Sequence, residues 1–359
     1  MPDYSNPSLI LVSDKIYSGK VAWQCPSNIA LIKYWGKYGQ QLPRNPSISF
    51  TLNNANTKTS IEYRSKEDDQ ISFDIIFEGK TREDFKPKIH KFLSQITNIY
   101  PFIKQLHFTI RSENSFPHST GIASSASSMG AIALCLCSIE ENLFGKLASL
   151  NSFYTKASFL ARIGSGSACR SIFPVASMWG KSTDIVSADD NFGIPFGDNI
   201  HPIFHSFHDD ILIVSAEEKA VSSTVGHELM NNNIYAESRY SQAKTNLHSL
   251  INTLKSGDLN TFIKIVEKEA LSLHALMMTS DPSFILILPE TLTLIEKIRI
   301  FRKEKNVPVC FTLDAGPNIH LLYPDEFAGE VGDFINSALS KHFKNILKDK
   351  IGPGPTKIL

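Results

Sequence analysis

The sequence predicts a mixed α+β fold, with helices interspersed among mainly antiparallel strands. Two patterns and one absence lead to this prediction. Ile48, Phe50 and Leu52 alternate with polar residues, which is typical of a strand with one buried face. A run rich in Ala and Leu at 124–143 predicts a long helix. No internal repeat of about 20 to 50 residues and no low-complexity tract is found.

The remaining elements follow from the same two periodicities. After an arm of about fifteen residues without periodicity, which we expect to be loose, strand patterns cover 19–24, 47–63, 71–77, 106–110, 211–215, 309–313 and 319–323. Helix patterns cover 86–100, 124–143, 152–162, 233–254, 259–278 and 292–303. Turn-forming residues gather at 189–201, so we expect an N-terminal domain of residues 1–200 and a C-terminal domain of residues 201–359.

The composition excludes several classes of protein. The chain has 359 residues and is 42% hydrophobic, enough for a sizeable core in two domains or one large two-layer domain. Lys plus Arg and Asp plus Glu are both 36, so no bulk field attracts nucleic acid or an anionic membrane. The N-terminus resembles neither a signal peptide nor a spanning helix, and cytoplasmic residence is the default expectation. The five scattered cysteines argue against a disulfide framework and fit a reducing compartment, and Cys135 and Cys137 are expected as small core residues.

The most informative segment is PHSTGIASSASSMGA at 117–131, where a loop of small residues enters a helix pattern. Gly121 permits a tight turn, the serines offer hydroxyl groups, and free N–H groups at a helix start attract phosphate. Similar stretches also form ordinary helix caps and linkers. The segment therefore indicates phosphate binding without establishing it.

Two further segments contain cations. PSNIALIKYWGK places Lys33 and Lys37 four residues apart beside Tyr34 and Trp35, an arrangement that could clamp an anion or expose two solvated lysines over core aromatics. RIGSGSACRS at 162–171 combines glycines and serines with Arg170, whose planar guanidinium matches a carboxylate or phosphate. GSGS alone would also suit a flexible linker.

Asp314 follows an apolar strand in TLDAGPN at 312–318. A carboxylate at the end of a buried strand is costly unless it is paired or used, yet Asp before Ala-Gly-Pro also caps turns, and both interpretations stay open. His201, His205 and His208 alternate with phenylalanines ahead of a strand. We interpret these histidines as a solvated edge rather than a metal site.

Five segments in order, NIALIKYWGK, ENSFPHSTGIASSAS, GSGSACRS, VSSTVG and TLDAGPN, resemble the diphosphomevalonate decarboxylases of the GHMP kinase superfamily. The resemblance spans nearly all of residues 22–354. It implies an N-terminal domain similar to ribosomal protein S5 domain 2, a ferredoxin-like C-terminal GHMP kinase domain, and a cleft between them. It also implies that ATP phosphorylates the 3-hydroxyl of mevalonate 5-diphosphate, after which phosphate and carbon dioxide leave to give isopentenyl diphosphate.

The resemblance also implies roles for individual residues. Asp314 would orient the 3-hydroxyl, Lys33 would offset charge on the transferred phosphoryl group, and Arg170 would grip the carboxylate that is lost. The residues implied to bind the substrate's diphosphate are Tyr34, Lys37, Ser165, Ser167, Ser223 and Thr224. Those implied to bind ATP are Asn114, Ser119, Gly121, Ser124, Ser125 and Ser127.

Magnesium would be carried mainly by the ATP phosphates, so we assign it no protein ligand. The resemblance further implies a homodimer that takes a small-molecule substrate and binds neither nucleic acid nor membrane. Two alternatives keep the fold, namely decarboxylation of mevalonate 5-phosphate and 3-phosphorylation without decarboxylation. A ligand sensor with a decayed site is a third, opposed by the joint presence of Lys33, Arg170 and Asp314.

The chain departs from the family pattern in three places. The family's PTAAGLASSAAG is here PHSTGIASSASS, which alters His118 and Ser128. After GSGSACRS the family usually has a Gly-Gly pair, whereas this chain continues IFPVASMWG, and the strand pairing there is left open. Ala168 stands near the position of the aspartate found in small-molecule kinases of the superfamily, which fits an acidic residue supplied by Asp314 instead.

Overall fold

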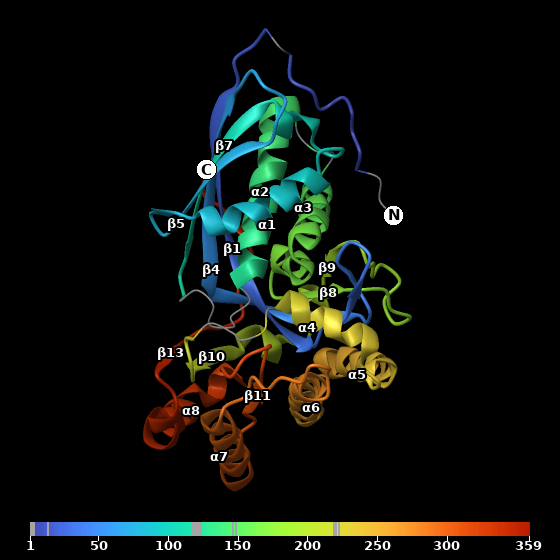
Figure 1. Cartoon of the computed structure of the whole chain (residues 1–359). Helices are drawn as coiled ribbons and strands as arrows, with labels where there is room; N and C mark the ends of the chain where they lie inside the picture. Colours follow the sequence, from blue (N-terminus) through green and yellow to red (C-terminus); the bar gives the residue numbers. More distant parts are fainter. Residues whose placement is uncertain are drawn as a thin grey trace.

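Two β-sheets, each covered by helices, build the molecule (Figure 1). The computed structural model describes residues 4–12, 14–116, 124–145, 147, 149–217, 221 and 223–359. Ser119 and Gly121 of the expected ATP loop lie outside the described residues.

The first sheet runs in the order β14-β1-β4-β7-β5-β6, and β8 joins it by pairing with both β4 and β9. Only β5 and β7 pair in parallel among these strands. The strands are β1 (Ser18–Ile32), β4 (Ser47–Ser65), β5 (Ser72–Phe77), β6 (Lys80–Thr81), β7 (Leu106–Asn114), β8 (Ala176–Trp179), β9 (Gly193–Pro195) and β14 (Thr356–Lys357). Three helices lie together beside this sheet: α1 (Lys86–Gln95), α2 (Ser124–Phe144) and α3 (Leu150–Gly164) (Figure 1).

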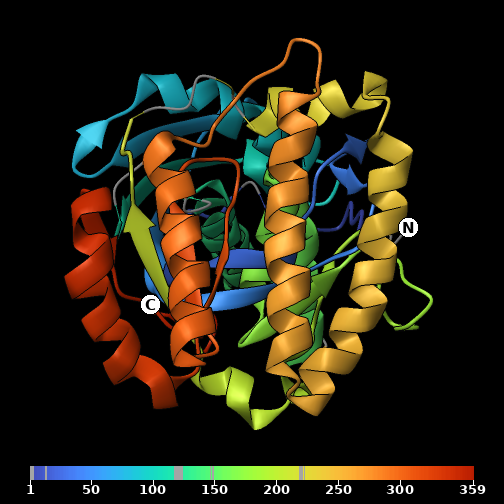
Figure 2. The same cartoon turned by 90° about the horizontal axis from the view of Figure 1, so that it is seen from below.

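The second sheet is antiparallel and runs in the order β11-β12-β10-β13. Its strands are β10 (His208–Ile213), β11 (Cys310–Thr312), β12 (Ile319–Tyr323) and β13 (Asn345–Leu347), and a separate hairpin pairs β2 (Lys37–Tyr38) with β3 (Leu42–Pro43). The helices of this half are α4 (Ser223–Leu229), α5 (Ala236–Ser256), α6 (Leu259–Met278), α7 (Pro289–Lys305) and α8 (Ala328–Phe334). Figure 2 shows α5, α6, α7 and α8 covering the lower surface.

The two halves share a hydrophobic core. Phe50 of β4 packs on Phe262 of α6, with ring centroids 6.0 Å apart, and Phe204 and Phe207 complete the cluster. The end of the chain returns to the first sheet, where β14 pairs with β1. Unfolding one half would therefore expose apolar surface of the other.

The buried face of each element explains why these residues form it. α2 is rich in Ala and Leu and is buried on almost every side between α3 and the sheet, which suits a helix with little polar surface. Asp258 caps α6 by accepting the N–H of Thr261 at 3.1 Å, and Gly257 ends α5 with a φ of 79°. These local signals separate two long helices by a two-residue turn.

Most expected elements are found within a few residues of their predicted positions, and the α+β prediction is confirmed. The expectation of a loose N-terminal arm is wrong for Leu9 and Leu11, which are buried against the first core. All five cysteines are buried and free, which confirms the core positions expected for Cys135 and Cys137. No helix among the described residues has the length and apolar character needed to span a membrane.

The sequence left open how the strand after Arg170 pairs. The structure shows that it pairs with β4, next to an unusual backbone conformation at Val175. β8 pairs with β4 over four residues although the chain lacks the Gly-Gly pair there. Val175 takes the left-handed conformation, with a φ of 63°, that a glycine would favour at this place. Its carbonyl accepts the N–H of Thr51, and its own N–H donates to Gly352, so the strained residue is held from both sides.

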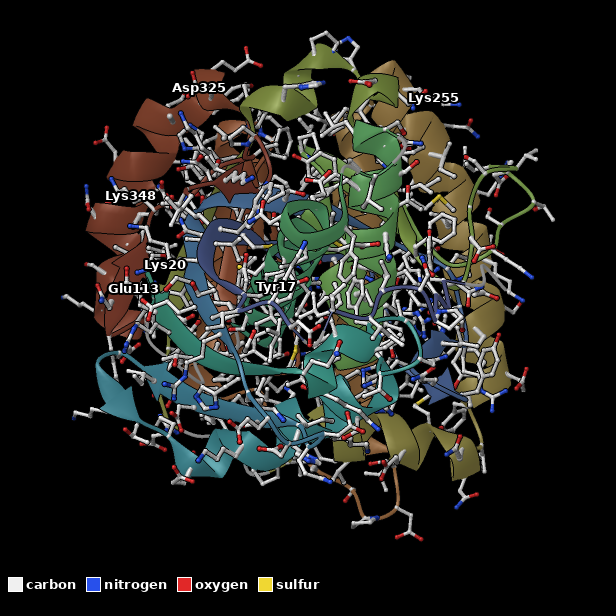
Figure 3. The ribbon with its side chains drawn as sticks, turned by 90° about the horizontal axis from the view of Figure 1, so that it is seen from above. Tyr17, Lys20, Glu113, Lys255, Asp325 and Lys348 are labelled. Carbon is white, nitrogen blue, oxygen red and sulfur yellow. The ribbon has the colours of Figure 1, made fainter. Side chains whose placement is uncertain are left out.

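Charged side chains of both signs lie exposed around the surface. Lys20, Glu113, Lys255, Asp325 and Lys348 are all exposed and are labelled in Figure 3. This mixture agrees with the balanced charge of the sequence.

Candidate active site

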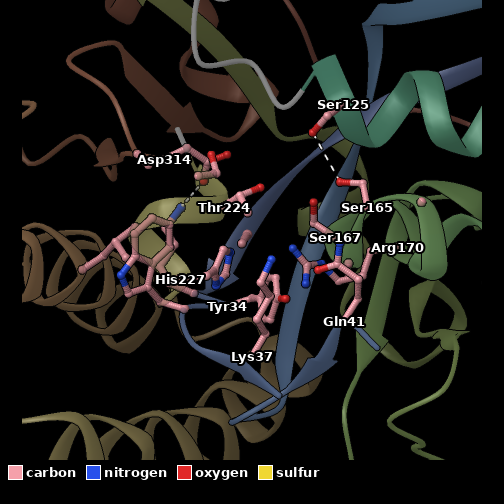
Figure 4. A pocket seen from close by; sticks show the side chains of 18 of the residues that line it. Tyr34, Lys37, Gln41, Ser125, Ser165, Ser167, Arg170, Thr224, His227 and Asp314 are labelled. Carbon is pink, nitrogen blue, oxygen red and sulfur yellow. Dashed lines mark hydrogen bonds and ion pairs between the residues drawn. The ribbon is translucent and has the colours of Figure 1, made fainter. Parts of the chain in front are cut away.

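A cavity of about 300 Å³ lies where the two halves meet, and Figure 4 shows it from close by. It is lined by the end of β1, the turn from α3 into a 3₁₀ helix, η3 (Gly166–Ile172), the start of α4 and the turn after β11. Ten of the predicted site residues line it: Lys33, Tyr34, Lys37, Ser125, Ser165, Ser167, Arg170, Ser223, Thr224 and Asp314. Lys33 and Asp314, 281 positions apart in the sequence, are thus brought together.

Lys33 and Asp314 form an ion pair at the wall of this cavity. Lys33 Nζ lies 3.0 Å from Asp314 Oδ1, and the side chain of Lys33 is 2% exposed while that of Asp314 is 26% exposed. Burial lowers the pKa of Lys33, and the carboxylates of Asp314 and Glu269 oppose that shift. The pair therefore presents a carboxylate oxygen to the cavity with a cation directly beside it.

Glu269 of α6 stands behind this pair and was missed by the sequence analysis. Its carboxylate accepts the backbone N–H of Lys33 at 2.9 Å and the amide of Asn246 at 2.6 Å, and it is fully buried. Arg239 of α5 donates to it at 3.0 Å. An acidic residue inside an otherwise apolar helical face was the available signal, because such a charge needs a partner.

Asp314 is also held through its backbone. Nε2 of His274, another buried residue of α6, donates to the carbonyl oxygen of Asp314 at 3.0 Å. The turn after β11 is thus tied to the helix that supports Lys33.

Arg170 faces the cavity from η3 and is 2% exposed. Its Nε donates to Ser49 Oγ at 3.1 Å and its Nη1 to Ser47 Oγ at 2.6 Å. Asn28 adds a longer contact of 3.4 Å to Nε. Nη2 has no hydrogen-bond partner among the described residues, and it is available to an anion in the cavity. Burial lowers the pKa of Arg170, but guanidinium stays protonated in proteins.

Tyr34 and the serines form the remaining polar wall. Tyr34 Oη is buried without a hydrogen-bond partner among the described residues. Ser125 Oγ lies 3.3 Å from Ser165 Oγ, a contact drawn in Figure 4. A buried hydroxyl group without a partner is costly, so this wall is suited to a ligand with many acceptor oxygens.

The residues assigned to ATP divide into two groups. Ser124 and Ser125 line a neighbouring, more apolar cavity of about 220 Å³, which shares Ser125 and Lys88 with the first. Ser127 and Asn114 line neither cavity. Ser127 Oγ bonds Thr57 Oγ1 at 2.6 Å, and Asn114 Oδ1 accepts from the same hydroxyl at 2.8 Å. In this structure they brace the start of α2 against β4.

The residues 201–208 do not gather into a metal site. Within the described part of the chain, no three His, Cys, Asp or Glu side chains are grouped closely enough to hold a metal ion. His208 instead pairs with Asp325 at 2.7 Å.

The sequence analysis also missed His227, Gln41 and Lys88 among the cavity residues. None of them lies in a motif that was recognised, and only the tertiary structure brings them to this wall. The signal for His227 was its position one residue after VSSTVG.

The two layered halves, with the serine-rich start of α2 beside their junction and a lysine–carboxylate pair at it, define a protein of the GHMP kinase fold. Residues 25–191 match the model of the diphosphomevalonate decarboxylase-like N-terminal domain, and residues 210–357 match that of the mevalonate 5-diphosphate decarboxylase C-terminal domain. The chain belongs to the diphosphomevalonate decarboxylase family.

Individual relatives are similar to this chain over nearly their full length. A diphosphomevalonate decarboxylase of Candida albicans is 28% identical, over 95% of this chain and 98% of its own. The crystal structure of mevalonate diphosphate decarboxylase from Staphylococcus aureus is 27% identical, with a TM-score of 0.80 over 96% of this chain and 99% of its own. A structure of MDDEF in complex with MVAPP, AMPPCP and magnesium is 26% identical, with a TM-score of 0.79 over 95% and 99%.

Proposed function

We propose that this chain decarboxylates mevalonate 5-diphosphate to isopentenyl diphosphate in an ATP-dependent reaction. The observation that supports it most directly is one cavity that holds the Lys33–Asp314 pair, Arg170 and the unpartnered hydroxyl of Tyr34. Relatives with this name and a related structure with MVAPP and an ATP analogue support the same assignment.

In the proposed reaction Asp314 orients the substrate's 3-hydroxyl and accepts its proton as the phosphoryl group is transferred to that oxygen. Lys33, 3.0 Å from the carboxylate, offsets the negative charge that develops on the transferred group. Arg170 holds the carboxylate through its free Nη2, and Ser47 and Ser49 keep its guanidinium in place. The electron pair of the broken carbon–carbon bond forms the new double bond, carbon dioxide leaves, and the 3-phosphate departs as phosphate.

The serine and tyrosine wall would bind the diphosphate end. We propose Tyr34, Lys37, Ser165, Ser167, Ser223 and Thr224 for that role, all of which line the cavity. For ATP we propose Ser124 and Ser125, with Ser119 and Gly121 assigned from the resemblance alone, and Ser127 and Asn114 as supports. Magnesium, when bound with ATP, would neutralise phosphate charge, and the described residues offer it no cluster of ligands.

We also propose that the protein is a cytoplasmic homodimer with a domain division near residue 200. The five buried free cysteines suit a reducing compartment. The match to the N-terminal family model ends at residue 191, and the match to the C-terminal model begins at residue 210. This gap supports the division. Sedimentation equilibrium tests the dimer, and a monomeric mass would reject it.

A coupled assay tests the function. Purified protein, ATP and magnesium are offered mevalonate, mevalonate 5-phosphate or mevalonate 5-diphosphate, while ADP and carbon dioxide are measured separately. We expect both products only with the diphosphate. Preference for the monophosphate, or ADP without carbon dioxide, would replace the proposal with decarboxylation of the monophosphate or 3-phosphorylation.

A further inference from the structure

His227 lies in the cavity wall, 8% exposed, on the short helix α4. The helix approaches Trp35 so closely that a Cβ at Gly226 would lie 2.5 Å from the indole ring. This approach places the next residue between two aromatic rings, with centroids 4.3 Å from Tyr34 and 4.5 Å from Trp35. The imidazole is therefore held in a defined position at the wall (Figure 4).

The hydrogen bond to Gly36 determines where the imidazole carries its proton. The backbone N–H of Gly36 donates to His227 Nδ1 at 2.9 Å. Because a backbone N–H can only donate, Nδ1 is unprotonated and the ring proton lies on Nε2. Burial lowers the pKa of His227 to about 3, and the cations Lys37 and Arg170 add to that shift. The ring is therefore a neutral donor near neutral pH.

This donor has no partner in the described structure. Nε2 makes no hydrogen bond to a described residue, although the ring lines the cavity. Tyr34 Oη, on the ring next to it, is buried and equally unpartnered. Lys37, Ser223 and Thr224 line the same wall. Two unpartnered polar groups beside a cation are suited to one ligand with several acceptor oxygens.

We propose that His227 binds the diphosphate end of the substrate by donating a hydrogen bond from Nε2. This inference rests on the proposed function for the identity of the substrate. The residue makes binding tighter and takes no part in the transfer of protons, since the Gly36 N–H keeps Nδ1 occupied as an acceptor.

Two amide variants separate this role from a structural one. His227→Asn keeps an acceptor near Nδ1 for the Gly36 N–H but removes the donor at Nε2. His227→Gln keeps a donor near Nε2 but cannot accept from Gly36 in the same way. A role in binding predicts that Gln is the milder change, whereas a purely structural role through Gly36 predicts that Asn is.

The affinity for inorganic pyrophosphate is measured by calorimetry with saturating ADP present, so that nucleotide phosphates do not compete. We expect His227→Asn to weaken binding about tenfold or more, as for a lost hydrogen bond to a charged group, and His227→Gln to retain most of the affinity. KM for mevalonate 5-diphosphate should rise in parallel, with little change in kcat. His248→Asn, at an exposed histidine paired with Asp184, is the matched control and should behave as the wild type.

Equal affinity of the Asn and Gln variants, or tighter binding by the Asn variant, would overturn the proposal.

The pyrophosphate titration needs no turnover, so it tests His227 separately from the proposed function. A protein that shows the expected order of affinities without decarboxylating the diphosphate would keep His227 as an anion ligand and reject the proposed function. Decarboxylation of the diphosphate together with the reverse order of affinities would support the proposed function and reject the role of His227.

Discussion

Lys33 is the residue on which most of the site depends, because two carboxylates bond to it. Asp314 pairs with its ammonium group, and Glu269 accepts its backbone N–H. The side chain is almost fully buried, so each negative charge matters for its protonation. The carboxylate at the cavity and the buried carboxylate behind it therefore both act on one lysine.

Replacement of Asp314 by Ala should abolish most turnover and leave substrate binding largely intact. Removal of a general base typically costs about 10²–10⁴-fold in rate. The measurement is kcat beside the dissociation constant of mevalonate 5-diphosphate, with circular dichroism to check folding. Asp314→Asn, of nearly the same shape, controls for the space left by Ala, and an unchanged kcat in either variant would refute the assigned role.

Arg170→Lys should also be severe, because an ammonium group cannot bond Ser47 and Ser49 while presenting a planar donor to a carboxylate. We expect a loss of about 10²-fold or more in kcat/KM, the scale of about 3 kcal/mol for a charged hydrogen-bond partner. Arg162→Lys is the matched control, since this buried arginine donates to the carbonyls of Asn191 and Gln40 and does not line the cavity. Its expected effect is on stability. Near-normal activity of the Arg170 variant would make Arg170 structural.

The pH profile tests the charge around Lys33. If the protonated lysine is required, activity falls as pH rises through its pKa, which lies below the ordinary value of 10.5 because of burial. Glu269 favours the charged form, so Glu269→Gln should lower that pKa further and move the alkaline limb of kcat/KM to lower pH.

Glu267→Gln controls for the loss of a buried acid on the same helix. Glu267 pairs with Arg299 and Arg302, and its replacement should leave the limb in place. Because Glu269→Gln also leaves Arg239 without its partner, the free energy of unfolding is measured for both variants. If the alkaline limb of kcat/KM lay at the same pH in Glu269→Gln and in the wild type, the prediction would be contradicted.

At the scale of elements, the strand after Arg170 shows how neighbours can impose an unfavourable backbone. Val175 has a φ of 63°, a conformation that is costly for a β-branched residue. Its hydrogen bonds with Thr51 and Gly352 hold it there and keep β8 paired with β4. Strand pairing thus outweighs the local preference.

Substitutions at Val175 should reverse a usual order of stability. Within regular elements Ala is more favourable than Gly by about 0.5–1 kcal/mol. In the left-handed region we expect Val175→Gly to be more stable than Val175→Ala by about 1 kcal/mol, because only Gly avoids the steric cost. Urea unfolding measures the difference. Higher stability of the Ala variant would mean that the strain is absent.

At the scale of the whole molecule, the halves are joined by both core and site. Phe50, Phe204, Phe207 and Phe262 form one aromatic cluster across them. The cavity takes Arg170 from one half and Asp314 from the other. A ligand there should stabilise the entire chain.

We therefore expect one calorimetric unfolding transition that moves to higher temperature with mevalonate 5-diphosphate. A ligand at a hundred times its Kd adds about 2.7 kcal/mol. Phe262→Ala should lower the single transition as a whole, at a cost of about 3–5 kcal/mol. Two separate transitions, of which only one responds to Phe262→Ala, would show that the halves unfold independently.

Local patterns in the sequence determined most elements and several site residues. Periodicity located α2, α5, α6 and β4 because burial of one face leaves a regular trace along the chain. Motifs singled out Lys33, Arg170 and Asp314, whose residue types are costly or unusual in apolar surroundings. The family likewise followed from motif order, and the matched domain models confirm it.

The tertiary structure alone decided which of these residues meet. The pairing of Lys33 with Asp314 joins positions 281 apart, and no local pattern records such a contact. Glu269 and His227 escaped notice because each stands singly in a helix, and each accepts a backbone N–H group that any residue carries. Ser127 and Asn114 are expected as ATP ligands from the motif, and packing against β4 gives both of them a hydrogen bond to Thr57. Sequence thus determined what each segment could do, whereas packing between distant segments decided which polar groups face the cavity.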